Sequence, residues 1–305
     1  MSSQRCQFIV QSGDENRLDK FLARQLPGQS RSRLQAIIKD GGVTVNETVA
    51  TKSGLALLTG DKISICIPEV VPGNLEPESI PLDIVFENEH LVIINKPAGM
   101  VVHPAPGHAS GTLVHAALGN FGDLQGIGGE VRPGIVHRLE KGTAGLISVA
   151  KNEKGHGGLQ EQFRLRKVKK TYLALVDGKP PTPSGRVEAA IARDAAHRKQ
   201  MTVVSDGRGR AAITEFHTVK QFNQHTLVEA HPLTGRTHQI RLHMAFLGCP
   251  IVGDLVYGRK KPSLDLERHF LHAYQISIIL PGESEARTFQ AELPADLQTI
   301  LDQLI

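Results

Sequence analysis

The chain has 305 residues, which is enough for about two domains, each with its own hydrophobic core. Hydrophobic residues make up 40% of the chain and charged residues 22%, and the formal net charge of +4 favours a polyanionic partner. No apolar stretch reaches the roughly 18 residues that a membrane span needs, and the first ten residues lack a signal-peptide core. Its three cysteines are scattered and match neither a disulfide framework nor a metal site, so we expect a cytoplasmic protein without membrane contact.

The first part of the chain predicts a small α/β domain. Apolar residues recur at helical spacing in 17–26 and again in 30–42, where a Gly-Gly pair ends the second helix. Two strands are expected to follow, at 43–46 and at 61–68, the second with isoleucine at alternate positions.

Basic residues accompany these elements, among them Arg31, Arg33 and Lys39. A solvated surface is one interpretation, because charged side chains normally face water. A face that contacts phosphate groups is the other. The order helix, helix, Gly-Gly, strand, and Gly-Asp before a last strand resembles the S4 RNA-binding domain, and this resemblance implies an RNA-contacting face.

A segment rich in Pro and Glu, from Pro68 to Pro81, interrupts the periodic patterns and is typical of an interdomain linker. We therefore expect an RNA-binding domain at residues 1–68, a linker at 69–81 and a second domain at 82–305.

Short strands dominate the expected second domain. Two are predicted within 82–97, and others at 146–151, 170–178, 213–219 and 226–233. Two or three helices are expected among them, one at 238–248, where apolar positions fall at helical spacing and a glycine ends the run. The fold class is therefore predicted to be α+β, with a mixed, largely antiparallel sheet and flanking helices.

Three histidines lie in the Pro- and Gly-rich stretch from Asn95 to Leu118, namely His103, His108 and His115. They do not have the spacing of a helical zinc site. Structural or RNA-contacting roles are favoured, and we expect no metal ion. The Gly-rich runs also lack a phosphate-binding loop, so we expect no nucleotide or other cofactor.

The stretch GIVHRLEKGTAGLISVAK, from Gly134 to Lys151, crowds four polar side chains ahead of an apolar strand. Glu140 lies between Arg138 and Lys141, and nearby positive charge keeps a carboxylate ionised. An ionised carboxylate in a cleft can act as a nucleophile or as a base. A surface ion-pair cluster is the alternative interpretation.

Arg236 and Arg241 lie on either side of a helix start in HPLTGRTHQIRLHMAFLGCPIVGD. Guanidinium groups there can bind phosphate or orient a carboxylate. Tyr172 lies among basic residues in VKKTYLALVDG, and it is one of only three tyrosines in a chain without tryptophan. Stacking of aromatic rings on nucleic acid must therefore be sparse.

Residues 82–295 resemble the RluA family of RNA pseudouridine synthases. The motifs that carry the resemblance are, in order, NKPAGMVVHP, GIVHRLEKGTAGLISVAK, KKTYLALVDG, HRKQM, LTGRTHQIRLHMAFLGCPIVGD with LVYG, and RHFLHAYQI. Together with the S4-like domain they resemble the branch that acts on large-subunit ribosomal RNA.

The resemblance implies an isomerase that detaches uracil from its ribose, rotates the base and reattaches it through carbon-5, without cofactor or metal. The target uridine is flipped from the RNA into the pocket. By position, Glu140 is the catalytic carboxylate, which either attacks the sugar or abstracts a sugar proton. Tyr172 would lie over the uracil, and Arg241, or alternatively Arg236, would pair with the carboxylate. Arg138 would assist base flipping or contact the RNA backbone, and Arg236 and His103 would also bind RNA.

The motif departs from the family at its centre, because the family has His-Arg-Leu-Asp and this chain has Glu140. The side chain is longer by one C–C bond, about 1.5 Å. Ala144 also stands where the family usually has Ser, and Ser148 interrupts the apolar strand.

Three hypotheses follow. The first is a monomeric pseudouridine synthase acting on structured RNA, with ribosomal RNA as the expected partner. The second is a catalytically silent RNA-binding protein on the same scaffold, with a role in ribosome assembly. The third is a ribosome-associated protein that depends on its N-terminal domain alone.

Overall fold

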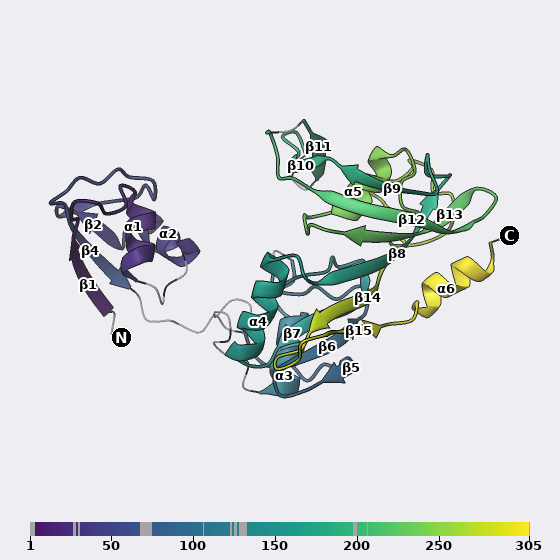
Figure 1. Cartoon of the computed structure of the whole chain (residues 1–305), viewed down its shortest axis with the longest axis horizontal. Coiled ribbons are helices and arrows are strands. Elements are labelled where there is room, and N and C mark those ends of the chain that lie inside the picture. Colours follow the sequence, from purple (N-terminus) through teal and green to yellow (C-terminus); the bar gives the residue numbers. More distant parts are fainter. Residues whose placement is uncertain are drawn as a thin grey trace. The chain divides into compact units, whose positions relative to one another are not determined.

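The computed structural model describes residues 4–26, 29, 31–67, 75–105, 107–122, 124, 127, 133–197, 200–205 and 207–304, with the backbone alone at 31–33 and 36. The chain divides into two compact units, Met1–Gly73 and Asn74–Ile305 (Figure 1). No helix within the described ranges is both long and apolar enough to cross a membrane.

The first unit contains two helices and a four-stranded antiparallel sheet. Its elements are β1 (Gln4–Ile9), α1 (Leu18–Gln25), α2 (Arg31–Lys39), β2 (Val43–Val45), β3 (Thr48–Val49) and β4 (Lys62–Ile67). The strands lie in the order β1-β4-β2-β3. The two predicted helices and the strands β2 and β4 are confirmed, whereas β1 and the short β3 were not predicted.

The apolar faces predicted for the two helices form the core of this unit. Leu22 and Leu34 are fully buried against the alternate isoleucines of β4. The Gly-Gly pair that ends α2 has a packing reason, because a Cβ on Gly42 would lie only 2.7 Å from Cγ2 of Ile37. A larger residue there would push α2 away from the sheet.

The second unit is built on one nine-stranded sheet with a separate two-stranded hairpin. Its strands are β5 (Asp83–Glu87), β6 (Leu91–Lys96), β7 (Ala144–Ala150), β8 (Lys169–Asp177), β9 (Ser184–Glu188), β10 (Ala190–Arg193), β11 (Met201–Val204), β12 (Ile213–Gln221), β13 (His225–Pro232), β14 (Leu271–Ile279) and β15 (Ala286–Gln290). Its helices are α3 (Leu113–Phe121), α4 (Glu153–Arg164), α5 (Gln239–Phe246) and α6 (Ala295–Asp302).

The sheet has the order β5-β6-β7-β14-β8-β13-β12-β9, and β15 pairs with β14. Only the pairing of β7 with β14 is parallel among the described strands, so the prediction of a mixed, largely antiparallel sheet is confirmed. The late strand β14 lies at the centre and joins the β5-β6-β7 half to the β8-β13-β12-β9 half (Figure 1).

The described part of this unit has four helices, one more than the upper expectation. Helix α4 was missed because Gly155, Gly157 and Gly158 lower its helix propensity. A Cβ on Gly155 would lie 2.1 Å from the carbonyl oxygen of His90, so close packing against the turn between β5 and β6 requires the glycine.

Two hydrophobic clusters stabilise the sheet. One surrounds β6, β7 and α3, and the other surrounds β8, β13 and α5. Tyr172 on β8 packs against both clusters. The central part of the sheet is therefore packed on both sides of this residue.

Candidate active site

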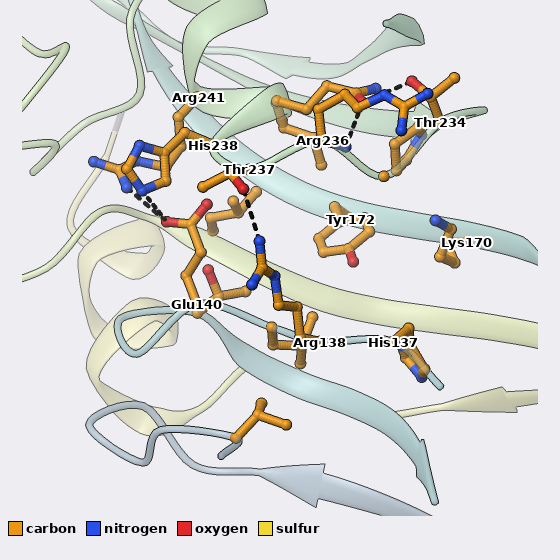
Figure 2. A pocket seen from close by; sticks show the side chains of 18 of the residues that line it. His137, Arg138, Glu140, Lys170, Tyr172, Thr234, Arg236, Thr237, His238 and Arg241 are labelled. Atoms are coloured by element: carbon orange, nitrogen blue, oxygen red, sulfur yellow. Dashed lines mark hydrogen bonds and ion pairs between the residues drawn. The ribbon is translucent and has the colours of Figure 1, made fainter. Parts of the chain in front are cut away.

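A cavity of about 1060 Å³ lies in the second unit and contains most of the residues singled out in the sequence. Its described lining includes eight lysine and arginine side chains but only one acidic side chain, Glu140. Figure 2 shows the Glu140 carboxylate pointing toward Arg241 and His238. A cavity with this charge balance attracts a phosphate backbone and places a single carboxylate within it.

The loop that carries Glu140 is pinned at both ends. Gly134 has a φ of +71°, and a Cβ there would lie 2.3 Å from the carbonyl oxygen of Ala150, so only glycine allows the start of the loop to pack this closely against the end of β7. The Leu139 side chain is buried, and the Glu140 carbonyl accepts a hydrogen bond of 3.1 Å from the Thr143 N–H. The carboxylate is thus presented from a fixed backbone.

His137 explains the polar residue in the otherwise apolar strand β7. The Ser148 N–H donates to Nε2 of His137 at 2.9 Å, and the Ser148 hydroxyl lies 2.9 Å from the same nitrogen. Burial lowers the pKa of His137 to about 3, with a smaller contribution from the charge of Lys170. The imidazole is therefore neutral, accepts through Nε2 and anchors the loop to the strand.

Glu140 belongs to a three-residue network with Arg241 and Asp254. Arg241 donates from Nη1 to Oε2 of Glu140 at 2.6 Å, and from Nε and Nη2 to the two Asp254 oxygens at 2.7 Å each. The side chains of Arg241 and Asp254 are buried, whereas that of Glu140 is 29% exposed and open to the cavity. Arg241 therefore has little freedom to move away from Glu140.

The protonation states in this network follow from its pairing. Burial alone would lower the pKa of Arg241, but the bond to Asp254 and the charge of Glu140 outweigh burial and raise it. Burial likewise favours neutral Asp254, yet the Arg241 bond and two backbone N–H groups hold its pKa below the usual range. The buried pair is thus fully ionised near neutral pH.

His238 and Tyr257 complete this side of the cavity. His238 has a left-handed backbone with a φ of +58°, its Nδ1 lies 2.8 Å from the Tyr257 hydroxyl, and its Nε2 lies 3.8 Å from Oε2 of Glu140. The Arg241 guanidinium also lies over the Tyr257 ring, 5.2 Å from its centroid. The strained backbone at His238 is consistent with a side chain held in place for a function.

Tyr172 and Lys170 project into the cavity from β8, opposite the arginine network. Burial, and then the charge of Glu140, raises the pKa of the Tyr172 phenol, so the hydroxyl stays protonated. Burial also lowers the pKa of Lys170 to about 8. This wall of the cavity therefore places an aromatic ring beside the Lys170 ammonium group, which loses its proton more readily than an exposed lysine does.

Three other predicted site residues of the second domain also line the cavity. Arg138 and His103 line the cavity, and Arg138 donates from Nη2 to the Thr237 hydroxyl at 2.7 Å, which links loops 99 residues apart (Figure 2). Arg236 also lines the cavity, but it donates to the Ala211 carbonyl at 3.1 Å, while Arg241 holds Glu140. The alternative pairing of Glu140 with Arg236 is therefore wrong.

His115 is structural. Its Nδ1 lies 2.7 Å from the Thr112 hydroxyl at the start of α3. In the first unit, Lys39 is exposed in the last turn of α2, and the side chains of Arg31 and Arg33 lie outside the described residues.

Asp254, His238, Thr237 and Tyr257 were not predicted as site residues. The only sequence signal for Asp254 was its place after a glycine at the end of the motif that contains Arg241. The contacts arise because the chain turns back after α5, which brings Asp254 under Arg241.

Comparisons with known proteins agree with this arrangement. The family model for RNA pseudouridylate synthase matches residues 90–246, and the S4 domain model matches residues 16–63. The chain is 42% identical to "Ribosomal large subunit pseudouridine synthase D" of Zymomonas mobilis, over 95% of this chain and 94% of that protein. It is 42% identical to "Uncharacterized RNA pseudouridine synthase YlyB" of Bacillus subtilis, over 94% of each chain.

A solved structure supports the same assignment. "Human RNA Pseudouridylate Synthase Domain Containing 4" superposes with a TM-score of 0.56 at 26% identity, covering 73% of this chain and 94% of that one. The fold and the cavity define an RNA-modifying isomerase with an N-terminal S4 domain. The chain belongs to the RNA pseudouridine synthase family.

Membership of this family confirms the prediction of an isomerase that acts on RNA, and the α+β fold class is confirmed with it. Neither the comparisons nor the described residues offer an observation that favours the catalytically silent alternative.

Proposed function

We propose that the chain converts uridines of large-subunit ribosomal RNA to pseudouridine, with Glu140 as the catalytic carboxylate. The observation that carries the proposal is the Glu140–Arg241–Asp254 network, which holds an ionised carboxylate at the wall of a basic cavity. The name of the Zymomonas relative supports ribosomal RNA as the substrate class.

Arg241 and His238 both approach Oε2 of Glu140, so Oε1 is the oxygen that meets the ribose. Attack on the sugar and abstraction of a sugar proton both use an ionised carboxylate, and Arg241 pairs with that carboxylate through Oε2. As charge on the carboxylate changes during the reaction, the fixed guanidinium stabilises the ionised form without reorganising. The fixed position of Arg241 thus sets the position from which the longer glutamate side chain reaches the ribose.

Tyr172 supports the uracil ring. Its half-buried, protonated phenol presents an aromatic face across the cavity from Glu140, and stacking on such a face contributes about 1–3 kcal/mol per base. Rotation of the detached base needs a contact that tolerates sliding, which stacking offers and a hydrogen bond to the base edge does not.

Arg138 joins the two loops that form the mouth of the cavity and binds the RNA at the flipped nucleotide. Arg236 and His103 contact the flanking backbone. The S4 domain contacts RNA through helix α2, with Arg31, Arg33 and Lys39. We place this domain at residues 1–68 and the catalytic domain at residues 82–305. The protein acts as a monomer in the cytoplasm.

Tritium release from ribosomal RNA labelled at carbon-5 of uridine tests the activity, since the carbon-5 hydrogen is lost when the glycosidic bond moves there. Pseudouridine mapping in total RNA from cells with and without the gene tests the substrate. A site in large-subunit ribosomal RNA that disappears with the gene supports the proposal. Loss of a site in transfer RNA alone would overturn the substrate assignment and leave the enzyme class intact.

A further inference from the structure

A cluster of three potential metal ligands lies on β12 and β13, outside the candidate active site. His217 lies directly opposite Glu229 in the antiparallel register, so the two side chains share one face of the sheet. His231 follows Glu229 by two residues and lies on that face too, whereas the intervening Ala230 and the next residue, Pro232, face the other side. Because Pro232 lines the cavity, the cluster faces away from it.

The Glu229 carboxylate already has the separations from both histidines that a metal ion requires. Glu229 Oε2 lies 3.3 Å from His217 Nε2 and 3.6 Å from His231 Nε2, the nitrogens through which the two rings would bind the ion. A tetrahedral ion with bonds of about 2.0–2.2 Å places its ligands about 3.3–3.6 Å apart. One atom from each residue fits within a 4.8 Å group, and the described residues contain no other such group of three His, Cys, Asp or Glu side chains.

The orientation of His231 is set by a neighbouring strand. Its Nδ1 lies 3.3 Å from the Thr171 hydroxyl on β8, which directs Nε2 toward Glu229 and His217. A hydrogen-bond partner on the ring nitrogen that does not bind the metal is typical of metal-binding histidines.

We propose that His217, Glu229 and His231 bind a divalent transition-metal ion of the zinc class. Two imidazoles and one carboxylate suit zinc, nickel or copper, whereas magnesium and calcium prefer oxygen ligands. Three protein ligands leave a fourth position for water, as expected for side chains that are 26–47% exposed. The bound ion cross-links β12 to β13 and stabilises this half of the sheet. This site is independent of the proposed RNA substrate.

The sequence analysis expected no metal, and the reason is geometric. Positions 217, 229 and 231 match no ligand spacing of a helix or a tight turn. The strand pairing brings them together, with the hairpin between β12 and β13 setting the register.

Isothermal titration calorimetry with ZnCl2 tests the proposal on the full-length, tag-free protein after treatment with a chelator. We expect one ion per chain with a Kd in the micromolar range or below. His217→Ala, Glu229→Gln and His231→Ala are each expected to weaken binding at least about tenfold, because even outer-shell changes cost about 10–100-fold. His197→Ala is the matched control, since His197 is an exposed histidine 3.6 Å from Asp194 and outside the cluster.

A second measurement reports the strand cross-link. At a zinc concentration of about 100 times Kd, we expect the wild-type Tm to rise by about 5–10 °C, and the rise to be lost in His217→Ala and His231→Ala but kept in His197→Ala. The absorption bands of bound Co2+ would show nitrogen and oxygen ligands. The proposal is overturned if the wild type binds zinc with a Kd more than 100 times the expected range, or not at all. It is also overturned if binding is unchanged in all three cluster variants, because the ion would then be held elsewhere.

Discussion

The guanidinium of Arg241 and the carboxylate of Asp254 form a bidentate pair, with both N···O distances at 2.7 Å. Both side chains are buried, and the remaining nitrogen of Arg241 is directed at Glu140. Arg241 therefore cannot follow the Glu140 carboxylate if that side chain is shortened or removed, because leaving Asp254 would cost the pairing of a buried charge.

Glu140 provides the first prediction. Glu140→Gln keeps the shape and loses the charge, so tritium release is expected to fall below detection with Tm nearly unchanged. Glu140→Asp withdraws the carboxylate by about 1.5 Å from a fixed Arg241 and is expected to lower kcat about 10–100-fold. Glu188→Gln, at an exposed glutamate paired with Arg186, is the control and should behave as wild type. A rate increase in Glu140→Asp would show that the site is adapted to aspartate.

Asp254 provides the second prediction. Asp254→Asn is expected to lower kcat about tenfold or more, because Arg241 loses its charged partner and its orientation toward Glu140. Tm should also fall by several degrees, since Arg241 is left buried with less compensation. Asp177→Asn is the matched control, because Asp177 is buried outside the cavity. That variant should lower Tm while kcat stays near wild type, and an equal loss of kcat in both variants would contradict an orienting role.

His137 makes stability depend on pH. Its pKa is about 3 in the folded protein and about 6.5 when unfolded, so the unfolded chain takes up a proton first as the pH falls. The contribution of neutral His137 is therefore complete above about pH 6.5 and is lost progressively as the pH falls toward 3. Between pH 7 and pH 5, the Tm of His137→Phe should fall less than that of the wild type, whereas His197→Ala should follow the wild type. Parallel curves for all three would exclude His137 as the source.

RNA affinity is expected to fall steeply with salt, because basic side chains release counterions from phosphate. Arg166 and Arg236 line the cavity, and each substitution to Ala should weaken binding and reduce the slope of log Kd against log salt by about one. Lys179 is exposed and outside the cavity, so Lys179→Ala serves as the control. Filter binding of a ribosomal RNA fragment at several salt concentrations measures the dependence of Kd on salt. A Kd that does not change with salt would contradict binding through phosphate contacts.

Residues 75–305 are expected to fold alone, because the two units have separate hydrophobic cores. Without the S4 domain, RNA binding should weaken or lose site selectivity, while Glu140 and its network remain intact. A cooperative thermal transition and the affinity for ribosomal RNA are the measurements. An insoluble fragment without a cooperative transition would contradict the division into domains.

The sequence predicted the fold class because strands such as β4 alternate cleanly and glycine or proline separates the elements. It missed β14, since a strand buried along most of its length lacks that alternation, and α4, since glycines required for close packing hide a helix. The motif order indicated Glu140, Arg241 and Tyr172, which the structure brings to one cavity. It favoured Arg241 as the partner of Glu140 but kept Arg236 as an alternative, because the choice depends on the turn that returns Asp254 beneath α5.

The central position of β14 has a consequence for biosynthesis. Leu271–Ile279 leaves the ribosome long after β7 and β8, yet it pairs with both of them, and its register places His272 beside Ala144. Until it emerges, the loop of Glu140 and the strand of Tyr172 belong to two unjoined halves of a sheet. Closure must then bring together segments more than 100 residues apart, which is intrinsically slow. Nascent chains stalled before residue 271 should therefore lack the cavity that contains Glu140, so that activity appears only after β14 has emerged.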